Sequence, residues 1–393
     1  MADRLDGVGE AGRTGTGIRG IIAVIVRTST YRGDMATSDP SLDPARVPGR
    51  IAAPPPSSPD GAVAGPLVGA TTENAVLSRI LPLFQQGAAA LLGPGDDAAI
   101  VASPDGRTVI SMDTLVEDHD FRLVRPNGFR TTGYDVGWKS AAQNLSDINA
   151  MGGSATSLVV SLTLPPQTPV DWVEDCARGL AAAIRGLGAA GCSVVGGDLG
   201  AGAQLVITAA VTGTLGGRAP VLRSGARPGH LVAVTGMLGR AAAGLAILED
   251  GRPVQDFGPL GEVFVAAQLR PLPPLTAGPA AADAGASAML DISDGLVRDA
   301  GRIATASGVH LDLDPEALLD HADPLRPVAR LLGVDPMEWV LGGGEDHGLL
   351  ATFPQDVLLP PGFTAVGSVR PGSPLVTLAS QATALRGWDH FAH

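Results

Sequence analysis

The order of strand-like and helical segments after residue 69 restricts the fold more than any other feature of this sequence. NAVLSRILPLF has the apolar spacing of a helix, whereas AAIVAS and TVISMDT have the composition of strands. The helical patterns TGYDVGWKSAAQNLSDINAMGG and WVEDCARGLAAAIRGLG then occur among the strand patterns SLVVSLTL, CSVVGG and QLVITAAVTGTL. Because strands and helices mix without strict alternation, the pattern favours an α+β fold over a doubly wound parallel sheet.

A break in this pattern divides the chain. GGRAPVLRSGARPGH interrupts it near residue 217, and it restarts with LVAVTG and the helical pattern GRAAAGLAILED. A length of 393 residues is also enough for two domains. We therefore predict one domain over residues 69–216 and a second over residues 217–393. Residues 1–68 are rich in proline, glycine and alanine, which predicts a disordered extension.

The charge balance argues against a nucleic-acid partner. The chain has 40 acidic and 27 basic residues, which gives a formal net charge of -13. Binding to nucleic acid would need a basic surface, so we expect no such partner. Lys139 is the only lysine in the sequence, and the phosphate-binding pattern GxxxxGKS/T is absent. Phosphate groups would therefore be met by metal ions, backbone amides or arginines.

Hydropathy and cysteine content predict the compartment. No apolar run approaches the roughly 20 residues that a membrane-spanning helix needs. Cys176 and Cys192 are too few for a disulfide framework and too far apart for a CxxC pair. We expect a reduced, cytoplasmic protein with no membrane partner.

Aspartates stand beside small residues at the edges of several apolar segments. Any one of them has a structural explanation, because aspartate is common at helix N-caps and in turns. Together they suit an oxygen-only site for Mg²⁺, which takes a few carboxylates and completes its shell with water and substrate phosphates. Such a site points to phosphoryl transfer. The residues are Asp96 and Asp97 in GPGDDAA, Asp113 in SMDT, Asp147 in NLSD, Asp198 in GGD, and Asp291 and Asp294 in DISDGL.

Glycines and an arginine near these aspartates could contact phosphate. The glycine runs before Asp198 and before Glu345 would let backbone amides approach a ligand closely. Ser293 can cap the helix that follows DISDG, and the N-terminus of that helix would attract an anion. Arg223 in LRSGARPG is either a bidentate phosphate ligand or an ordinary surface arginine.

The motifs, taken in order, resemble those of one family. They are GPGDDAA, SMDTLVEDHDF, DVGWKSAAQNLSDINAMGG, VVGGDLG, LRSGARPG, VAVTGMLGRAAAGLAIL, DISDGLVRDAGRI, LGGGEDHGLL and GWDHF. From about residue 72 to the C-terminus, the chain resembles the thiamine-monophosphate kinases, which belong to the superfamily of aminoimidazole ribonucleotide synthetase. The resemblance implies that superfamily's two-domain fold, with an α/β N-terminal domain and an α+β C-terminal domain. It also implies a homodimer.

The resemblance further implies a reaction. These kinases use ATP and Mg²⁺ to phosphorylate thiamine monophosphate to thiamine diphosphate. The phosphate oxygen of the substrate attacks the γ-phosphoryl group in line, and because that oxygen is already anionic near neutral pH, no general base is required. Several Mg²⁺ ions would screen the two phosphate chains from each other.

Site residues carry over from the family motif by motif. Glu345 would contact the thiamine moiety. The implied ATP contacts are Gly197, Asp198, Arg223 and Ser293. The implied metal ligands are Asp97, Ser111, Met112, Asp113, Asp147, Asp198, Asp291 and Asp294, with Asp96 as an orienting neighbour of Asp97.

The sequence departs from the family at several of these places. Met112 stands where the family often has threonine, and since a thioether is a poor Mg²⁺ ligand, a metal contact there would come from the backbone or be absent. Asp120 occupies the place of a substrate-binding histidine, with His119 one residue earlier, and either could contact the substrate. Leu385 aligns with an aromatic residue that packs on thiamine in relatives, and Trp388 could replace it.

Two other functions stay open on the sequence. The chain could be a different ATP-dependent synthetase of the superfamily, although a selenophosphate synthetase would need a cysteine near the N-terminus and none precedes Cys176. It could also be a catalytically silent metal- or nucleotide-binding relative. The intact aspartates and the combination of DISDGL with GGED favour the kinase.

Overall fold

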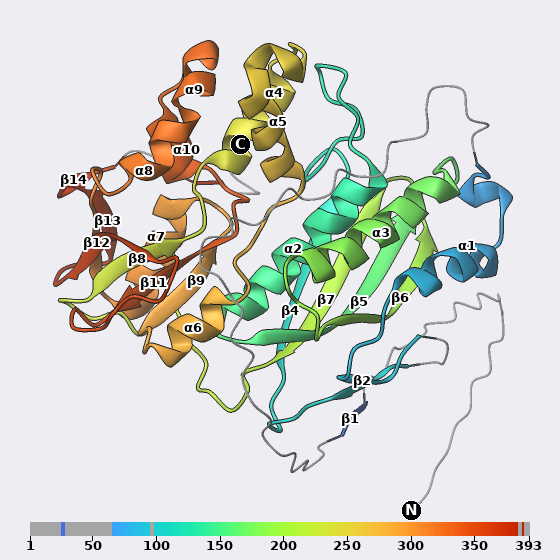
Figure 1. The fold of residues 1–393 in the computed structure, drawn as a ribbon, viewed down its shortest axis with the longest axis horizontal. Coiled ribbons are helices and arrows are strands. Elements are labelled where there is room, and N and C mark those ends of the chain that lie inside the picture. The colour runs from blue at the N-terminus through green and yellow to red at the C-terminus, as the bar shows by residue number, and fades with distance from the viewer. Residues whose placement is uncertain (1–24, 28–64, 95–97, 384–386, 389–393) are drawn as a thin grey trace, which may run out of the picture.

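The computed structural model describes residues 25–27, 65–94, 98–383 and 387–388. Within these ranges the strands form a four-stranded sheet, a seven-stranded sheet and a small three-stranded sheet. Figure 1 shows the four-stranded sheet on the right and the seven-stranded sheet on the left, with helices packed against each. We refer to residues 65–214 as the N-terminal half and to residues 231–388 as the C-terminal half.

The four-stranded sheet forms the centre of the N-terminal half. Its order is β4-β7-β5-β6, and only the pair β5 and β6 is parallel. Two helices cover one of its faces, where the apolar side chains of alternate strand positions are buried. The elements are β4 (Val109–Val116), β5 (Ser154–Leu164), β6 (Ser193–Ala201), β7 (Val206–Thr214), α2 (Gly133–Ala150) and α3 (Val170–Gly186).

The two covering helices pack against each other through glycine. A Cβ atom on Gly137 of α2 would lie 2.0 Å from the carbonyl oxygen of Cys176 in α3. No side chain fits in that space, so the close approach requires glycine. Thr132 and Asp135 form a capping box that begins α2. The predicted helix in this segment is confirmed.

Short elements complete the N-terminal half. The small sheet has the order β1-β3-β2. Near the start of the described chain, Val68 N–H donates to the carbonyl oxygen of Thr168 at 2.8 Å. Of the predicted extension over residues 1–68, only residues 25–27 and 65–68 are described, and the rest lies outside the described residues. The elements are β1 (Ile25–Arg27), the 3₁₀ helices η1 (Val68–Ala70) and η2 (Leu81–Leu83), α1 (Glu73–Ile80), β2 (Ala90–Leu92) and β3 (Ile100–Ala102).

The seven-stranded sheet organises the C-terminal half. Its order is β14-β13-β10-β12-β8-β11-β9, with antiparallel neighbours except for β10 and β13. This mixture of helices with largely antiparallel strands agrees with the predicted α+β class. The strands are β8 (Leu231–Thr235), β9 (Ala288–Ile292), β10 (His310–Leu313), β11 (Gly348–Phe353), β12 (Thr364–Arg370), β13 (Leu375–Leu378) and β14 (Gln381–Ala382).

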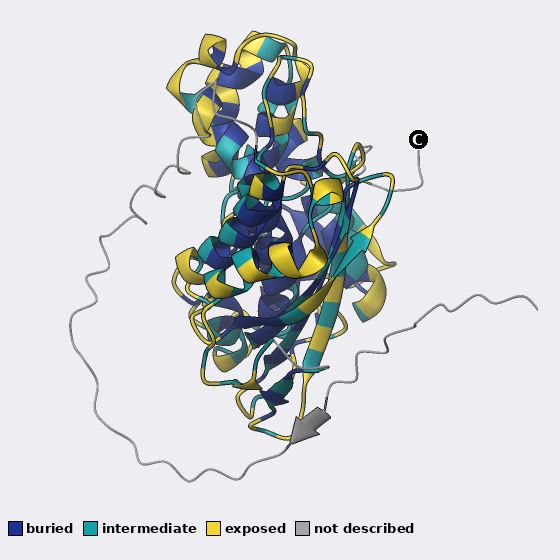
Figure 2. Ribbon diagram, turned by 90° about the vertical axis from the view of Figure 1, so that its right-hand side faces the viewer, coloured by how far each residue is buried: buried dark blue, intermediate teal, exposed yellow. Residues whose placement is uncertain are grey.

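Helices surround this second sheet and bury its core. Figure 2 shows the buried residues concentrated where helices meet sheets. Among the described helices, none is both long and apolar enough to cross a bilayer. The helices are α4 (Arg240–Glu249), η3 (Val254–Phe257), α5 (Gly258–Leu269), α6 (Ala277–Asp283), α7 (Leu296–Ser307), α8 (Leu319–Ala322), η4 (Asp323–Leu325), α9 (Arg326–Leu332) and α10 (Pro336–Gly342).

Helix α2 joins the two halves. Trp138 Nε1 donates to the carbonyl oxygen of Pro271 at 2.9 Å, and Asn149 Nδ2 donates to that of Pro274 at 3.1 Å. Asn149 Oδ1 also accepts from Gly278 N–H at 2.8 Å. The predicted boundary near residue 217 falls in the connection between β7 and β8, and its role as a domain boundary stays a prediction.

Candidate functional site

Three carboxylates from different elements meet where α2 crosses between the halves. Asp113 lies on β4, Asp147 near the end of α2, and Asp291 on β9. Ser111 and Asp113 share one face of β4 because strand residues two apart point the same way. Ser111 Oγ donates to Asp147, and Asp113 forms a side-chain hydrogen bond with Asp147. The fold thus groups residues that the sequence predicted as metal ligands.

Asp291 is fixed by two neighbours that the sequence did not single out. Ser146, one residue before Asp147, donates from Oγ to Asp291 Oδ2 at 3.0 Å. His347 Nδ1 lies 3.1 Å from the same oxygen. Burial alone would lower the pKa of His347, but its hydrogen bond and charge interaction with Asp291 raise that pKa above its usual value. Asp291 therefore has a hydrogen-bonding partner in each half.

The electrostatics of the carboxylates suit a cation. Burial, Asp291 and Asp113 together raise the pKa of Asp147 to about 7. The pKa of Asp113 is also raised, chiefly by burial. No three or more His, Cys, Asp or Glu side chains among the described residues form a ready metal cage. Mg²⁺ does not need one, since it commonly binds one or two carboxylates together with substrate phosphates and water.

The loop between α10 and β11 lies beside these carboxylates. Glu345 and His347 have left-handed backbone conformations, with φ of 65° and 53°. Such conformations cost energy for residues with side chains and cluster at functional sites. A Cβ atom on Gly344 would lie 2.5 Å from the carbonyl oxygen of Ser293, which also accepts from Glu345 N–H at 2.8 Å. The glycines before Glu345 thus let the loop pack against DISDG.

Glu345 and Asp346 of this loop are held by different parts of the fold. Lys139 Nζ of α2 lies 2.5 Å from Glu345 Oε1, and Gln268 of α5 donates to Glu345 Oε2. Asp346 accepts from the N–H groups of Gly239 at 2.5 Å and Ala241 at 2.9 Å, so it caps the start of α4. The sequence offered no signal for these partners, because they are distant along the chain.

Asp294 begins the loop that leads into α7. Arg302 pairs with both Asp294 and Asp299, and Asp299 Oδ2 accepts from Asp294 N–H at 3.0 Å. Helix α7 has Gly295 at its N-cap and no side-chain cap, so Ser293 does not have the capping role suggested by the sequence. Trp388 N–H donates to the carbonyl oxygen of Asp294 at 2.9 Å, which places this half-exposed tryptophan beside DISDG.

Two predicted metal ligands face the other side of the four-stranded sheet. Met112 alternates with Ser111 and Asp113, and its side chain is 64% exposed on the outer face. Across β5 and β7, the strand register places Asp198 in line with Thr114, and residues in line across a sheet point to the same face. The exposed side chain of Asp198 therefore lies on the outer face as well. A Cβ atom on Gly197 would lie 2.0 Å from a neighbouring carbonyl oxygen, so strand packing alone requires this glycine.

Three other predicted contact residues lie at the edges. Asp120 Oδ2 accepts from Val116 N–H at 2.7 Å and so closes the turn after β4, whereas His119 is exposed. Arg223 is exposed and its carbonyl oxygen accepts from Ser307. Asp96, Asp97 and Leu385 fall outside the described residues.

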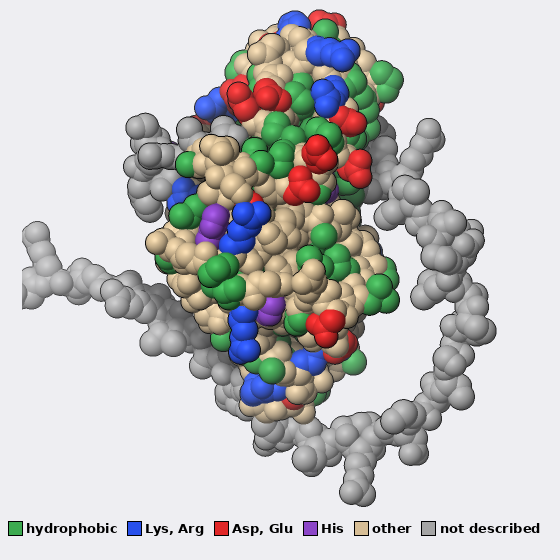
Figure 3. Space-filling model, turned by 90° about the vertical axis from the view of Figure 1, so that its left-hand side faces the viewer, with side chains coloured by type: hydrophobic (Ala, Val, Ile, Leu, Met, Phe, Trp, Pro, Cys, Tyr) green, Lys and Arg blue, Asp and Glu red, His purple; other side chains and the backbone are tan. Residues whose placement is uncertain are grey.

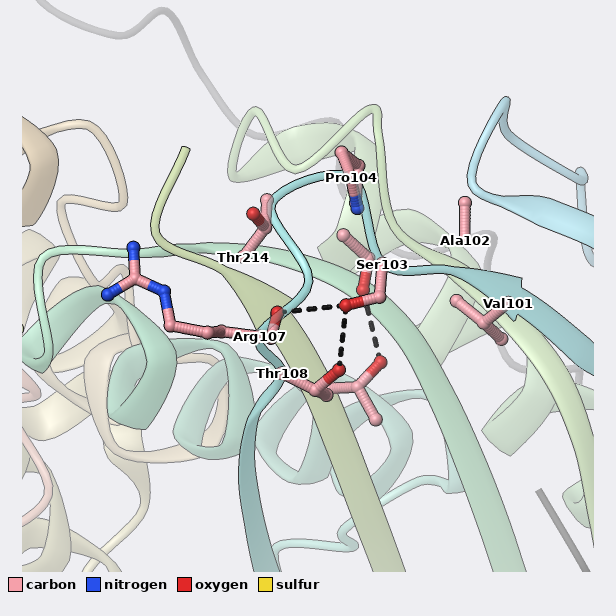
Figure 4. Close-up of a pocket in the computed structure, with 10 residues that line it drawn as sticks. Val101, Ala102, Ser103, Pro104, Arg107, Thr108 and Thr214 are labelled. Atoms are coloured by element: carbon pink, nitrogen blue, oxygen red, sulfur yellow. Dashed lines mark hydrogen bonds between the residues drawn. The ribbon is translucent and has the colours of Figure 1, made fainter. Parts of the chain in front are cut away.

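A small pocket lies apart from the carboxylates, between the β3–β4 connection and β7 (Figure 4). Ser103 Oγ donates to the carbonyl oxygen of Arg107 at 3.0 Å and lies 3.2 Å from Thr108 Oγ1. Thr156 Oγ1 and Thr212 Oγ1 form a hydrogen bond of 3.0 Å. These hydroxyl groups satisfy one another, so the pocket offers little to a ligand.

Comparison with known proteins identifies the family. Residues 95–215 match the family model of the AIR synthase related protein, N-terminal domain. Thiamine-monophosphate kinase of Mycobacterium tuberculosis is 45% identical over 320 residues, which cover 81% of this chain and 91% of that protein. The chain belongs to the thiamine-monophosphate kinase family. The enzyme of Corynebacterium glutamicum is 38% identical over 85% of this chain and 98% of its own length.

Solved thiamine-monophosphate kinases share the fold. A structure of AaThiL complexed with AMPPCP and TMP has a TM-score of 0.63 at 31% identity, covering 72% of this chain and 87% of that chain. The kinase from Stenotrophomonas maltophilia K279a has a TM-score of 0.65 at 29% identity, covering 79% and 96% of the two chains. The predicted family, the two-domain fold of the superfamily and the kinase class are therefore confirmed. The ligand set of this thiamine-monophosphate kinase family member stays a prediction.

Proposed function

We propose that this enzyme uses ATP to phosphorylate thiamine monophosphate to thiamine diphosphate, and that Asp113, Asp147 and Asp291 bind Mg²⁺ for the reaction. The convergence of these carboxylates from β4, α2 and β9 is the observation that carries the proposal. The AaThiL structure with AMPPCP and TMP supports the choice of both substrates.

The three aspartates would bind metal from both halves of the molecule. Asp113 and Asp147 would bind Mg²⁺ on the N-terminal half, and Asp291 would bind Mg²⁺ on the C-terminal half, with Ser146 and His347 fixing that carboxylate. When bound, Mg²⁺ would supply positive charge that offsets the phosphate oxygens during transfer. Asp97, Ser111, Asp198 and Asp294 remain proposed further ligands.

Transfer would be direct and in line. The acceptor is a phosphate oxygen that is anionic near neutral pH, so the site needs no proton acceptor, and we assign none. Glu345 would bind the organic ring, and Trp388, which lies beside Asp294, offers an exposed aromatic surface for stacking. The substrate would thus lie across the junction between the halves.

Formation of thiamine diphosphate from thiamine monophosphate and ATP, with and without Mg²⁺, tests this proposal. Free thiamine and aminoimidazole-type phosphates serve as control acceptors. Metal-dependent turnover of the monophosphate alone is the expected result. Turnover of another acceptor would favour a different ATP-dependent synthetase of the superfamily. ATP binding without turnover of any acceptor would favour a catalytically silent relative.

We also propose that the enzyme is a cytoplasmic homodimer. β4 is an edge strand of its sheet, and Ile110 and Met112 are 73% and 64% exposed on its outer face. A second copy would cover this apolar edge, which would otherwise invite aggregation. Cys176 and Cys192 are free and buried, which suits a reducing compartment. Figure 3 shows acidic and basic side chains interspersed on one face of the molecule, which does not favour nucleic acid.

A further inference from the structure

The only lysine of this acidic chain is buried at the junction between the halves. Lys139 is 4% exposed, and its Nζ lies 2.5 Å from Glu345 Oε1. A buried ammonium group is costly unless it is paired. Among the described residues, most of the other ion pairs are made by arginines that are at least partly exposed, so the buried position of Lys139 calls for a specific reason.

Glu345 is anchored from inside and open to the outside. Lys139 occupies one carboxylate oxygen, and the buried amide of Gln268, which is 2% exposed, occupies the other. The Glu345 side chain nevertheless remains 32% exposed. A carboxylate offers about four lone-pair positions, so two anchoring bonds leave acceptor capacity on the exposed side.

The backbone supports the same arrangement. Glu345 adopts the strained left-handed conformation, and its N–H donates to the carbonyl oxygen of Ser293. Two residues later, His347 contacts Asp291 of the proposed metal site. Helix α2 also carries Ser146 to Asp291, so one helix holds both Glu345 and Asp291 from the same side. The geometry therefore fixes the position of the Glu345 carboxylate relative to the carboxylates of the proposed metal site.

We propose that Lys139 is a positioning residue for substrate recognition, which with Gln268 aims Glu345 so that its free lone pairs accept hydrogen bonds from an amino-substituted cationic heteroaromatic ring. This inference rests on the proposed function, in which thiamine monophosphate carries such a ring and a phosphate. Lys139 acts through Glu345 and has no role in phosphoryl transfer itself. Its loss should therefore weaken binding of the ring much more than binding of ATP.

Steady-state kinetics of four variants test this assignment. Lys139→Met removes the charge with little change in volume, and Lys139→Arg keeps the charge. Glu345→Gln removes the acceptor charge, and the double variant Lys139→Met/Glu345→Gln completes a cycle. Arg125→Met is the matched control, because Arg125 is 6% exposed and pairs with Glu249 across the same junction at 2.7 Å, away from Glu345.

Lys139→Met should raise the KM for thiamine monophosphate about tenfold or more, while the KM for ATP stays within about twofold. Lys139→Arg should recover most of this loss. The double variant should match Glu345→Gln, because Lys139 acts only through that residue. Arg125→Met should lower the melting temperature without changing either KM.

Three results would overturn the inference, and they can be told apart from failure of the proposed function. Equal changes in both KM values, or a change in melting temperature alone, would reduce Lys139 to a structural link between the halves. Additive effects in the double variant would show that it does not act through Glu345. Wild-type enzyme that fails to convert thiamine monophosphate would overturn the proposed function and this inference with it.

Discussion

At the scale of single residues, the proposed metal site depends on charge at Asp147. Asp147→Asn keeps the shape of the side chain and can still accept from Ser111, but it removes a negative charge from the site. We expect kcat to fall about 100- to 1,000-fold, the usual cost of removing one electrostatic contact from the transition state. Turnover assays with thermal melting curves measure the effect.

The control is Asp175→Asn. Asp175 pairs with Arg178 on the surface of α3, and its side chain is 37% exposed. Surface pairs of this kind contribute little, so activity and stability should both be unchanged. Full activity in Asp147→Asn would remove Asp147 from the site.

Asp346 gives the stability of the enzyme a pH dependence. Burial raises its pKa to about 7 from an ordinary value of 3.8, although the N–H groups of Gly239 and Ala241 oppose the shift. Between these two values the folded state keeps a proton that the unfolded state has lost. The stability that this proton contributes is fully present below pH 3.8 and is lost as the pH rises to 7.

Asp346→Asn should therefore gain stability relative to wild type over that pH range. Asparagine can still accept a hydrogen bond at the start of α4 but does not titrate. Relative to wild type, the free energy of unfolding of the variant should rise by roughly 2–4 kcal/mol as the pH rises from 4 to 7. Denaturant titrations at several pH values measure it, and a constant difference would show that the carboxyl group of Asp346 has an ordinary pKa in the folded enzyme.

Residue types in the sequence predicted part of the site, but not the pairings. Asp113, Asp147 and Asp291 could be predicted to meet, because each follows an apolar segment within a recognisable motif. The outward direction of Met112 follows from strand alternation once β4 is known. Ser146 is 145 positions from Asp291 in the sequence, and His347 is 56 positions from it. Only the fold brings these two residues into contact with Asp291.

At the scale of elements, the packing of α2 on α3 sets the position of Asp147. Gly137→Ala would place a Cβ atom 2.0 Å from the Cys176 carbonyl oxygen, so the helices would have to separate. We expect a loss of about 1–3 kcal/mol or more in the free energy of unfolding, as for other overpacked cores. Chemical denaturation measures the loss, and kcat should fall with it because α2 carries Asp147 and also Ser146, which bonds to Asp291.

Gly301→Ala on α7 is the matched control for this substitution. No atom lies within 4 Å of a Cβ atom built on Gly301, and its helical backbone suits alanine. This change should stabilise the enzyme by about 0.4–1 kcal/mol. Equal effects of the two substitutions would mean that α2 and α3 can separate at no cost.

The helix patterns were predicted well at this scale because strong signals bound them. Thr132 and Asp135 mark the start of α2, and glycines mark its end. The strand order β14-β13-β10-β12-β8-β11-β9 could not be predicted in the same way. It depends on which segments bury each other's apolar faces, and the alternating pattern of each strand is compatible with several neighbours.

At the scale of the whole molecule, the proposed homodimer depends on the open edge of β4. Met112→Lys would place a charge in the proposed interface, while Met112 contributes nothing to the core because it is 64% exposed. A homodimer should dissociate to monomers, since burying unpaired charge against a copy of itself is costly. Light scattering after size-exclusion chromatography measures the mass. Leu358→Lys is the control, because Leu358 is 92% exposed in the C-terminal half and should leave a dimer intact.

The activity of the monomeric variant then shows whether dimerisation matters for the reaction. Asp198 lies on the same outer face as Met112, away from Asp113 and Asp147. If Asp198 takes part in the reaction, an arrangement that covers this face has to bring it near a substrate. Loss of turnover in monomeric Met112→Lys would support such a role for the second copy. A wild-type enzyme that is monomeric, or a variant that stays dimeric, would place the interface elsewhere or remove it.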